Sequence, residues 1–170
     1  MEILTPKRIK RPEWLKIRLN TNSEFQDTHR LIEKQNLNTV CEEARCPNIY
    51  ECWGRKTATI MILGDVCTRA CGFCSVKTGK PTWFDEGEPM RTAEAVKAMR
   101  LKHVVITSVD RDDIKDDFGS SIWAKTINET RKLNPNCSIE VLTPDFRGYL
   151  PAIKTVFFQN QIFFLIIQRQ

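Results

Sequence analysis

The stretch Cys67-Thr-Arg-Ala-Cys71-Gly-Phe-Cys74 places three thiols on one short segment, at intervals of four and three residues. Thiolates are soft, anionic ligands that suit zinc and iron–sulfur centres. Three of them can bind a metal centre and leave one coordination position open for a substrate, as catalytic zinc sites do. A structural zinc site would normally show paired Cys-x2-Cys elements, which this spacing does not provide. The stretch therefore predicts a catalytic metal centre with Cys67, Cys71 and Cys74 as ligands.

A buried strand is predicted directly before this loop. Residues 57–64, Thr-Ala-Thr-Ile-Met-Ile-Leu-Gly, are β-branched or apolar and end in glycine, which is typical of a parallel strand covered on both faces. Similar runs recur at residues 103–109 and 138–143, and helical patterns separate them, one from Thr92 as N-cap to Met99 and one over 120–133. This β–α–β–α–β series predicts an α/β fold with a parallel sheet.

Each predicted strand is followed by a loop that is richer in reactive or charged residues than the strand itself. The cysteine loop follows the first strand, Asp110-Arg-Asp-Asp113 follows the second, and Pro144-Asp-Phe-Arg-Gly148 follows the third. In barrel-like α/β folds the loops at the carboxyl ends of the strands form the active face. We therefore expect these three loops to meet on one rim.

Three smaller expectations concern the segments around this core. We expect residues 81–89 to be a linker whose Trp83 and Phe84 cover the core. We expect His29 to be a partly exposed histidine of a short helix rather than a metal ligand. Cys137, just before the third strand, is predicted to be a structural thiol.

A second group of thiols precedes the first strand, at Cys41, Cys46 and Cys52. Their spacing of five and six residues is too irregular for one helix face, so a folded loop has to gather them. Three thiols so close together, with Glu and Arg between them, argue against three ordinary buried cysteines. The second triplet therefore indicates a second metal site beside the first.

Composition predicts a globular protein of a reducing compartment. The chain has 170 residues, of which 41% are hydrophobic and 28% charged, enough for one domain with a core. Its seven cysteines are an odd number and no apolar leader follows Met1, so we expect a cytoplasmic protein rather than a secreted disulfide protein. The basic first 22 residues are expected to be a surface arm, clamped by Trp14, Ile17 and Leu19, and not a nucleic-acid interface.

Six segments together resemble a known family. They are Glu13-Trp-Leu-Lys-Ile-Arg, Thr39-Val-Cys-Glu-Glu-Ala-Arg-Cys-Pro-Asn, Glu51-Cys-Trp-Gly, Gly64-Asp-Val-Cys-Thr-Arg-Ala-Cys-Gly-Phe-Cys, Thr107-Ser-Val-Asp-Arg-Asp-Asp and Glu140-Val-Leu-Thr-Pro-Asp-Phe-Arg-Gly. The chain resembles the lipoyl synthase family of the radical S-adenosylmethionine (SAM) superfamily, from about Pro6 to Leu150. The paired cysteine triplets are highly specific to that family.

The resemblance implies a partial (βα) TIM-type barrel of the radical SAM kind, truncated after about three β/α units and preceded by a cysteine-rich extension. The implied segments are the extension over 1–55, the partial barrel over 56–155 and an atypical apolar tail over 156–170. Two four-iron, four-sulfur clusters are implied, a SAM-binding one on Cys67, Cys71 and Cys74 and an auxiliary one on Cys41, Cys46 and Cys52. The implied SAM contacts are Phe73, near the adenine, and Thr107, Ser108 and Asp110.

The family's reaction inserts sulfur at C6 and C8 of an octanoyl chain attached to a lipoyl carrier domain, with the auxiliary cluster as the sulfur source. The resemblance therefore implies a radical SAM sulfurtransferase of lipoate biosynthesis. Its implied partners are octanoylated carrier domains of 2-oxoacid dehydrogenase E2 subunits, the glycine cleavage H protein, and an electron donor such as ferredoxin or flavodoxin. Unactivated C–H bonds offer nothing to acid–base catalysis, so cofactors have to carry this chemistry.

The end of the chain departs from the family. Family chains normally continue beyond this length and supply a serine as fourth ligand of the auxiliary cluster, so we expect little or no lipoyl formation by this chain alone. Residues 156–167 are too short and too polar to span a membrane, which leaves a strand, an interfacial helix or appended out-of-frame sequence, the last being favoured. A catalytically inactive iron–sulfur or zinc binding fragment remains the alternative function, and the Cys41–Cys52 triplet disfavours a different sulfur-inserting radical enzyme.

Overall fold

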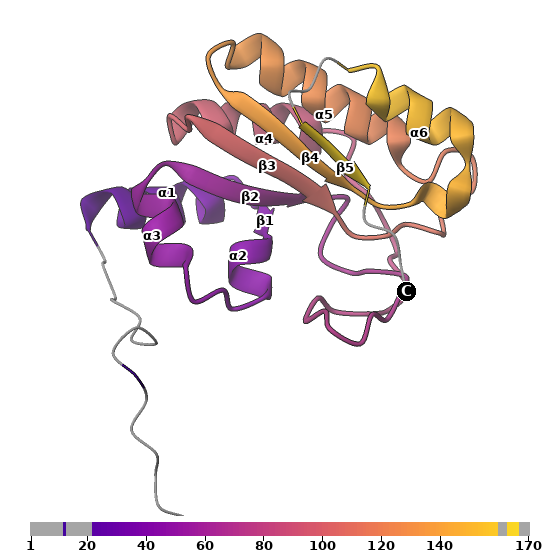
Figure 1. The fold of residues 1–170 in the computed structure, drawn as a ribbon, viewed down its shortest axis with the longest axis horizontal. Helices are drawn as coiled ribbons and strands as arrows, with labels where there is room; N and C mark the ends of the chain where they lie inside the picture. Colours follow the sequence, from indigo (N-terminus) through magenta and orange to yellow (C-terminus); the bar gives the residue numbers. More distant parts are fainter. Residues whose placement is uncertain (1–11, 13–21, 160–162, 167–170) are drawn as a thin grey trace, which may run out of the picture.

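A computed structural model describes residues 12, 22–159 and 163–166, and it contains one mixed sheet (Figure 1). The strands are β1 (Asn38–Thr39), β2 (Thr57–Ile62), β3 (His103–Ser108), β4 (Ser138–Thr143) and β5 (Phe163–Ile166), and they lie side by side in chain order. β2 to β5 pair in parallel, and only β1 runs antiparallel to its neighbour. The predicted parallel sheet is confirmed. The predicted clamp of Trp14, Ile17 and Leu19 lies outside the described residues.

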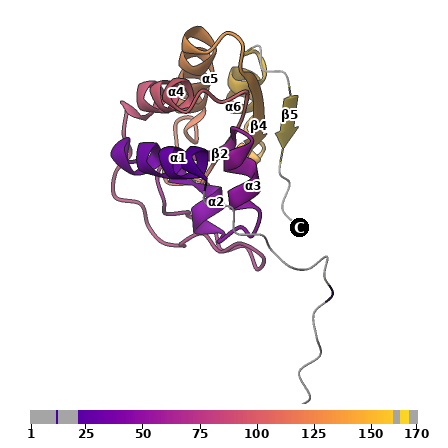
Figure 2. The ribbon, with the colours of Figure 1, turned by 90° about the vertical axis from the view of Figure 1, so that its left-hand side faces the viewer.

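The helices that alternate with the strands cover one face of this sheet (Figures 1 and 2). They are α4 (Glu88–Ala98), α5 (Ser120–Leu133) and α6 (Leu150–Phe157). The other three helices lie near the β1 edge of the sheet and are α1 (Ser23–Lys34), α2 (Val40–Glu43) and α3 (Ile49–Gly54). Three strand–helix units followed by a fourth parallel strand agree with a partial barrel. No helix of the described residues is long and apolar enough to cross a membrane.

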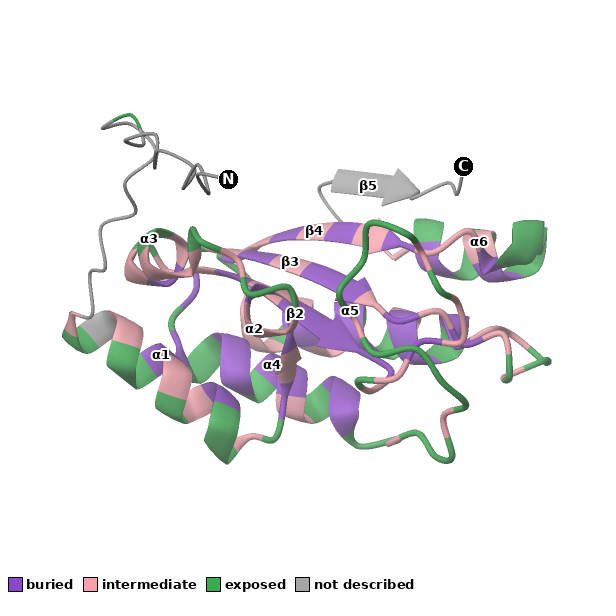
Figure 3. Ribbon diagram, turned by 90° about the horizontal axis from the view of Figure 1, so that it is seen from below, coloured by how far each residue is buried: buried purple, intermediate pink, exposed green. Residues whose placement is uncertain are grey.

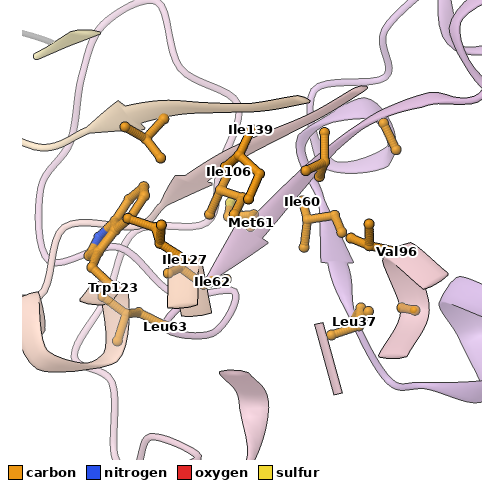
Figure 4. Close-up of a cluster of buried hydrophobic side chains, with 14 of the residues drawn as sticks. Leu37, Ile60, Met61, Ile62, Leu63, Val96, Ile106, Trp123, Ile127 and Ile139 are labelled. Atoms are coloured by element: carbon orange, nitrogen blue, oxygen red, sulfur yellow. The ribbon is translucent and has the colours of Figure 1, made fainter. Parts of the chain in front are cut away.

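The core lies between the sheet and the helices and follows the period-two alternation of the strands. The strand residues that face the helices are fully or almost fully buried, namely Ala58, Ile60, Ile62, Val104, Ile106, Ile139 and Val141. Figure 4 shows Ile60 beside Val96 of α4, and Trp123 and Ile127 of α5 near Leu63. Figure 3 shows the same burial along β2, β3 and β4. Burial of each such isoleucine side chain away from water stabilises the folded state by about 2 kcal/mol.

The alternate residues of the strands face away from these helices. Thr59 and Met61 of β2, Thr107 of β3 and Leu142 of β4 line a pocket on that opposite face. The Thr107 hydroxyl donates to the Leu142 carbonyl at 3.0 Å, which joins β3 to β4 beside the pocket. The face that would lie inside a closed barrel is therefore less apolar than the face under the helices.

Helix α4 begins earlier than predicted, at Glu88 instead of after Thr92. Pro89 fits the first turn because that turn leaves its backbone N–H groups without helical partners. The Asp85 carboxylate accepts the Gly87 N–H at 2.7 Å, immediately before the helix, and Thr92 is buried inside it. A threonine can be an N-cap only where the residues before it are not helical, and residues 88–91 before Thr92 are helical.

The prediction that the linker aromatics cover the core is wrong. Trp83 is 65% exposed and Phe84 is 42% exposed, and the linker is held beside the turn after β3, where Arg111 donates to the Trp83 carbonyl at 3.3 Å. Phe84 instead lies under the Arg111 guanidinium, 6.0 Å from the ring centre to Cζ. The other smaller expectations agree with the structure, since Cys137 is buried and the His29 side chain is partly exposed in α1.

The tail region contributes to the fold. Helix α6 extends to Phe157 with Val156 fully buried, and Phe163–Ile166 pairs in parallel with Glu140–Thr143 of β4. Of the three alternatives for the tail, the structure shows a strand over Phe163–Ile166, whereas the appended out-of-frame sequence concerns the origin of the segment and stays a prediction. The physical reason for the strand is that β4 would otherwise present a row of unpaired backbone groups at the sheet edge.

Candidate functional site

The cysteine loop leaves β2 through two residues in the left-handed region of the backbone map, Leu63 (φ +68°) and Gly64 (φ +92°). This conformation is unfavourable for leucine, and side chains from two other segments hold it. The Leu63 N–H donates to the buried Glu88 carboxylate at 2.7 Å, and Nη1 of Arg111 donates to the Leu63 carbonyl at 3.1 Å. Burial raises the pKa of Glu88, and the backbone N–H groups of Leu63 and Gly64 offset part of that effect.

The loop then closes on itself and on the neighbouring strand. The Cys67 N–H donates to the Lys77 carbonyl and the Gly79 N–H donates to the Cys67 carbonyl, both at 2.9 Å. The Thr68 N–H donates to the Asp110 carbonyl, just after β3, at 3.0 Å. The cysteine loop is thus attached to the carboxyl end of β3.

A buried arginine brings the third predicted loop to the same place. Arg69 contacts Asp112 from the turn after β3, at 2.6 Å, and Asp145 from the turn after β4, at 2.8 Å. The expectation that the three loops meet on one rim is therefore confirmed. In Figure 1 this rim is the end of the sheet to which the arrows of β2, β3 and β4 point.

The rim encloses a pocket of about 290 Å³ on the sheet face opposite the helices. Every residue predicted for the SAM-binding site lines it, namely Cys67, Cys71, Phe73, Cys74, Thr107, Ser108 and Asp110. Met61, Val76 and Leu142 supply apolar walls, and Arg69 and Asp110 supply charge. Residues from segments far apart in the sequence, such as Cys67 and Asp110 at a separation of 43 positions, thus line a single cavity.

The three thiols of the loop differ in their surroundings. Cys67 is buried, Cys71 is partly buried and Cys74 is exposed, next to Phe73 with 87% of its surface exposed. The Cys67 sulfur accepts the N–H of Asp110 at 3.3 Å and that of Arg69 at 3.5 Å. Burial raises the pKa of Cys67, and these two N–H groups act against that rise.

This donor set fits a three-thiolate cluster. The three thiols line one cavity, and two backbone donors already point at the Cys67 sulfur, which is the arrangement that stabilises a bound thiolate. Thr107 and Ser108 of β3 line the same cavity and offer hydroxyl groups to a polar ligand. Among the described residues, however, no three Cys, His, Asp or Glu side chains are arranged closely enough to hold a single metal ion.

The triplet of Cys41, Cys46 and Cys52 lies next to this pocket. Cys41 is in α2, Cys46 follows that helix and donates its N–H to the Cys41 carbonyl at 3.0 Å, and Cys52 is in α3. Burial raises the pKa of Cys52 first, and the charges of Cys41 and Cys46 raise it further, so the three thiols are electrostatically coupled. Val40, adjacent to Cys41, lines the pocket that Cys67, Cys71 and Cys74 also line.

Sequence reasoning missed the charged residues that hold the rim together: Glu88, Arg69 and Arg111. For Glu88 and Arg69, nothing in the neighbouring sequence indicates a buried side chain. A usable signal was present only in Arg111, which stands between acidic residues directly after a predicted strand. The partners of Glu88 and Arg69 come from distant segments.

Comparison with known proteins identifies close relatives. No protein-family model matches the chain. The chain is 55% identical over 149 residues to the lipoyl synthase of Staphylococcus aureus (strain bovine RF122 / ET3-1), which covers 87% of this chain and 48% of the relative. It is 56% identical over 147 residues to the lipoyl synthase of Symbiobacterium thermophilum, and this match covers 86% of this chain and 46% of the relative. It is 54% identical over 149 residues to the lipoyl synthase of Staphylococcus carnosus, and this match covers 87% of this chain and 48% of the relative. The chain spans about half the length of these curated relatives, and over that span it is a homologue of lipoyl synthases.

Proposed function

We propose that the chain acts in lipoyl synthesis, as a radical SAM sulfurtransferase that inserts two sulfur atoms at C6 and C8 of a protein-bound octanoyl chain. The observation that carries the proposal is the match of 54–56% identity to lipoyl synthases, over a span that includes both cysteine triplets. The shared pocket of Cys67, Cys71 and Cys74 supports the same conclusion, because it sets three thiols beside polar groups of a strand end.

The proposed cofactors are two four-iron, four-sulfur clusters and SAM. Cys67, Cys71 and Cys74 would hold the cluster that binds SAM, and Cys41, Cys46 and Cys52 would hold the auxiliary cluster. When bound, the reduced cluster and SAM supply a radical able to abstract hydrogen from an unactivated C–H bond. The chain itself holds the thiolates at the rim, directs two backbone N–H groups at Cys67 and shields that sulfur from water.

The proposed SAM contacts are Phe73, Thr107, Ser108 and Asp110. All four line the pocket, and the Asp110 carboxylate provides a negative charge for a cationic ligand. We expect Asp110→Ala to weaken SAM binding by at least about 1 kcal/mol, the scale of one charge-assisted hydrogen bond. Isothermal titration of SAM into the reconstituted protein measures this difference, and an unchanged affinity would remove the turn after β3 from the site.

The proposed protein substrates are octanoylated lipoyl carrier domains, such as those of 2-oxoacid dehydrogenase E2 subunits or the glycine cleavage H protein. An electron donor of the ferredoxin or flavodoxin kind would supply the electrons. A reducing cytoplasm suits the seven cysteines, all of which are free thiols in the structure.

Anaerobic reconstitution with iron and sulfide tests the proposal. We expect close to two four-iron clusters per chain and reductive cleavage of SAM. Replacing Cys67, Cys71 and Cys74 by alanine should abolish SAM cleavage, whereas replacing Cys41, Cys46 and Cys52 should preserve it and remove any sulfur insertion. Mass spectrometry of an octanoylated carrier domain detects the sulfur atoms that are added.

Two results decide against the proposal. Zinc in place of iron after anaerobic purification and reconstitution would contradict the redox chemistry. A chain that holds both clusters and yet does not cleave SAM would correspond to the alternative, an iron–sulfur binding fragment without catalysis.

A further inference from the structure

Arg69, between the first two thiols of the cysteine loop, is directed toward the strand ends and has a side chain only 9% exposed. Its Nε and Nη2 atoms donate to the two carboxylate oxygens of Asp112, both at 2.6 Å. Its Nη1 atom donates to Oδ1 of Asp145 at 2.8 Å and lies 3.3 Å from Oδ1 of Asp110. One side chain therefore joins the cysteine loop to the turns after β3 and β4.

The guanidinium of Arg69 supplies a positive charge beside these carboxylates. A planar guanidinium binds a carboxylate through two parallel hydrogen bonds, which a lysine ammonium cannot do. The hydrogen bonds to Asp112 raise the pKa of Arg69 above its ordinary value, against the opposite effect of burial, so the group stays charged. Replacing Arg69 would remove the guanidinium that contacts three carboxylates, those of Asp110, Asp112 and Asp145, from two turns.

The residues on the N-terminal side of Cys71 are held to the turn after β3. Thr68, which precedes Arg69, is held twice by the Asp110 carbonyl, through its N–H at 3.0 Å and its hydroxyl at 2.9 Å. Residues 72–75 are all exposed. Arg69 is thus the side chain that ties the loop down immediately before its second and third thiols.

We propose that Arg69 is a positioning residue that fixes the cysteine loop on the strand rim, so that Cys71 and Cys74 face the same cavity as Cys67. The inference rests on the proposed cluster site for its purpose, although the positioning itself is a property of the metal-free chain. Arg69 also lines the pocket, but its positioning role requires no contact with the cofactor or the substrate. Its effect is transmitted through the turns after β3 and β4.

Hydrogen exchange of the metal-free, reduced chain tests the positioning directly. Peptides that cover residues 65–79 are compared in the unmodified chain, in Arg69→Gln and in Arg30→Gln. Arg30 is the matched control, because its guanidinium is exposed and pairs with an exposed Asp27 in α1, away from the rim. We expect amide exchange across residues 67–74 to be at least about tenfold faster in Arg69→Gln and unchanged in Arg30→Gln, since local opening sets these rates.

A spectroscopic signature separates positioning from general destabilisation. After anaerobic reconstitution, adding SAM should change the electron paramagnetic resonance spectrum of the reduced cluster in the unmodified chain, and this change should be lost or reduced in Arg69→Gln. Arg69→Lys should give intermediate results in both measurements, because it keeps the charge and loses the two-bond contact with Asp112. If Arg69→Gln does not fold, Asp112→Asn replaces it, with a predicted acceleration of at least about threefold across residues 67–74.

Unchanged exchange across residues 67–74 in Arg69→Gln, or in Asp112→Asn if that variant is used, would overturn the inference. So would a SAM-induced spectral change in Arg69→Gln as large as in the unmodified chain. Failure of the proposed function looks different. The unmodified chain itself would then show no cluster that responds to SAM, whereas the exchange comparison in the metal-free protein would still decide the role of Arg69.

Discussion

Arg111→Ala is expected to lower the free energy of unfolding more than any change of an exposed arginine in this chain. The Arg111 side chain is 2% exposed and makes four hydrogen bonds. Two go to the Asp113 carboxylate at 2.8 Å, and two go to the carbonyls of Leu63 and Trp83 at 3.1 and 3.3 Å. These bonds connect the end of β2, the linker and the turn after β3.

The magnitude follows from which partners water can reach after the change. Leu63 is buried, so its carbonyl would be left unsatisfied at a cost of about 1–3 kcal/mol. Asp113 is 35% exposed and can be rehydrated, which keeps the total near the lower end of the roughly 3–5 kcal/mol measured for broken buried pairs. We therefore expect a loss of about 3 kcal/mol.

Urea denaturation of the reduced, metal-free chain at pH 7 measures the loss. Arg55→Ala is the control, because Arg55 forms an exposed pair with Glu51 at 2.7 Å and should cost no more than about 1 kcal/mol. Arg111→Lys should recover only part of the loss, since an ammonium cannot replace the planar fork. A loss below about 1 kcal/mol for Arg111→Ala, or one equal to the control, would refute the reasoning.

The pH dependence provides a second check on Arg111. The Arg111 guanidinium, through its hydrogen bonds, lowers the pKa of Asp113 in the folded chain. A lowered carboxyl pKa contributes stability that is present above the ordinary aspartate value of about 3.9 and is lost as the pH falls through the folded value. The difference in unfolding free energy between the unmodified chain and Arg111→Ala should therefore narrow below about pH 4. A gap that widens in acid would contradict the assignment.

Three further changes test other parts of the structure. Glu88→Gln keeps an acceptor for the Leu63 N–H. Because burial raises the pKa of Glu88 in the folded chain, the unmodified chain should lose stability relative to this variant as the pH rises from about 4 through that raised pKa. Urea denaturation at a series of pH values measures this difference. Gly119→Ala should cost at least about 1–2 kcal/mol in thermal unfolding, because φ is +83° and the new Cβ would lie 2.6 Å from Cδ1 of Leu63. Gly72→Ala is the control, because a Cβ there would have no atom within 4 Å, and it should change stability by less than about 0.5 kcal/mol. Equal effects of the two changes would contradict this prediction. Cys137→Ala should lower stability by about 1 kcal/mol and leave the iron content after reconstitution unchanged, and a loss of iron would show that this buried thiol is not merely structural.

Much of the fold could be predicted because periodicity is a local property. The runs at 57–64, 103–109 and 138–143 contain enough β-branched and apolar residues to predict strands, and the helical stretches between them require parallel pairing. The predicted helix over 120–133 and the strand over 138–143 match α5 and β4 to the residue. Errors occurred where the local signal was ambiguous, as at the start of α4, where Thr92 resembled a cap and Pro89 was assigned to the linker.

The candidate site was predictable for a similar reason. Parallel strands carry their following loops to the same edge, so chain order alone predicts that the loops after β2, β3 and β4 meet. Thiols are chemically distinctive, and their spacing identifies them as candidate ligands without any knowledge of contacts. The positions of Cys67, Cys71 and Cys74 on one cavity with Thr107, Ser108 and Asp110 agree with that reasoning.

The sequence by itself therefore determined the order of strands and helices, the edge at which the loops gather and the thiols that are candidate metal ligands. Only the tertiary structure decided which partners the buried charged side chains have at that edge. Arg69 and Asp112 are separated by 43 residues, Arg111 and Leu63 by 48, and Leu63 and Glu88 by 25. The physical reason is that burial repeats with the local period of a strand or helix, whereas a hydrogen bond between distant segments depends on which loops the sheet register brings within about 3 Å.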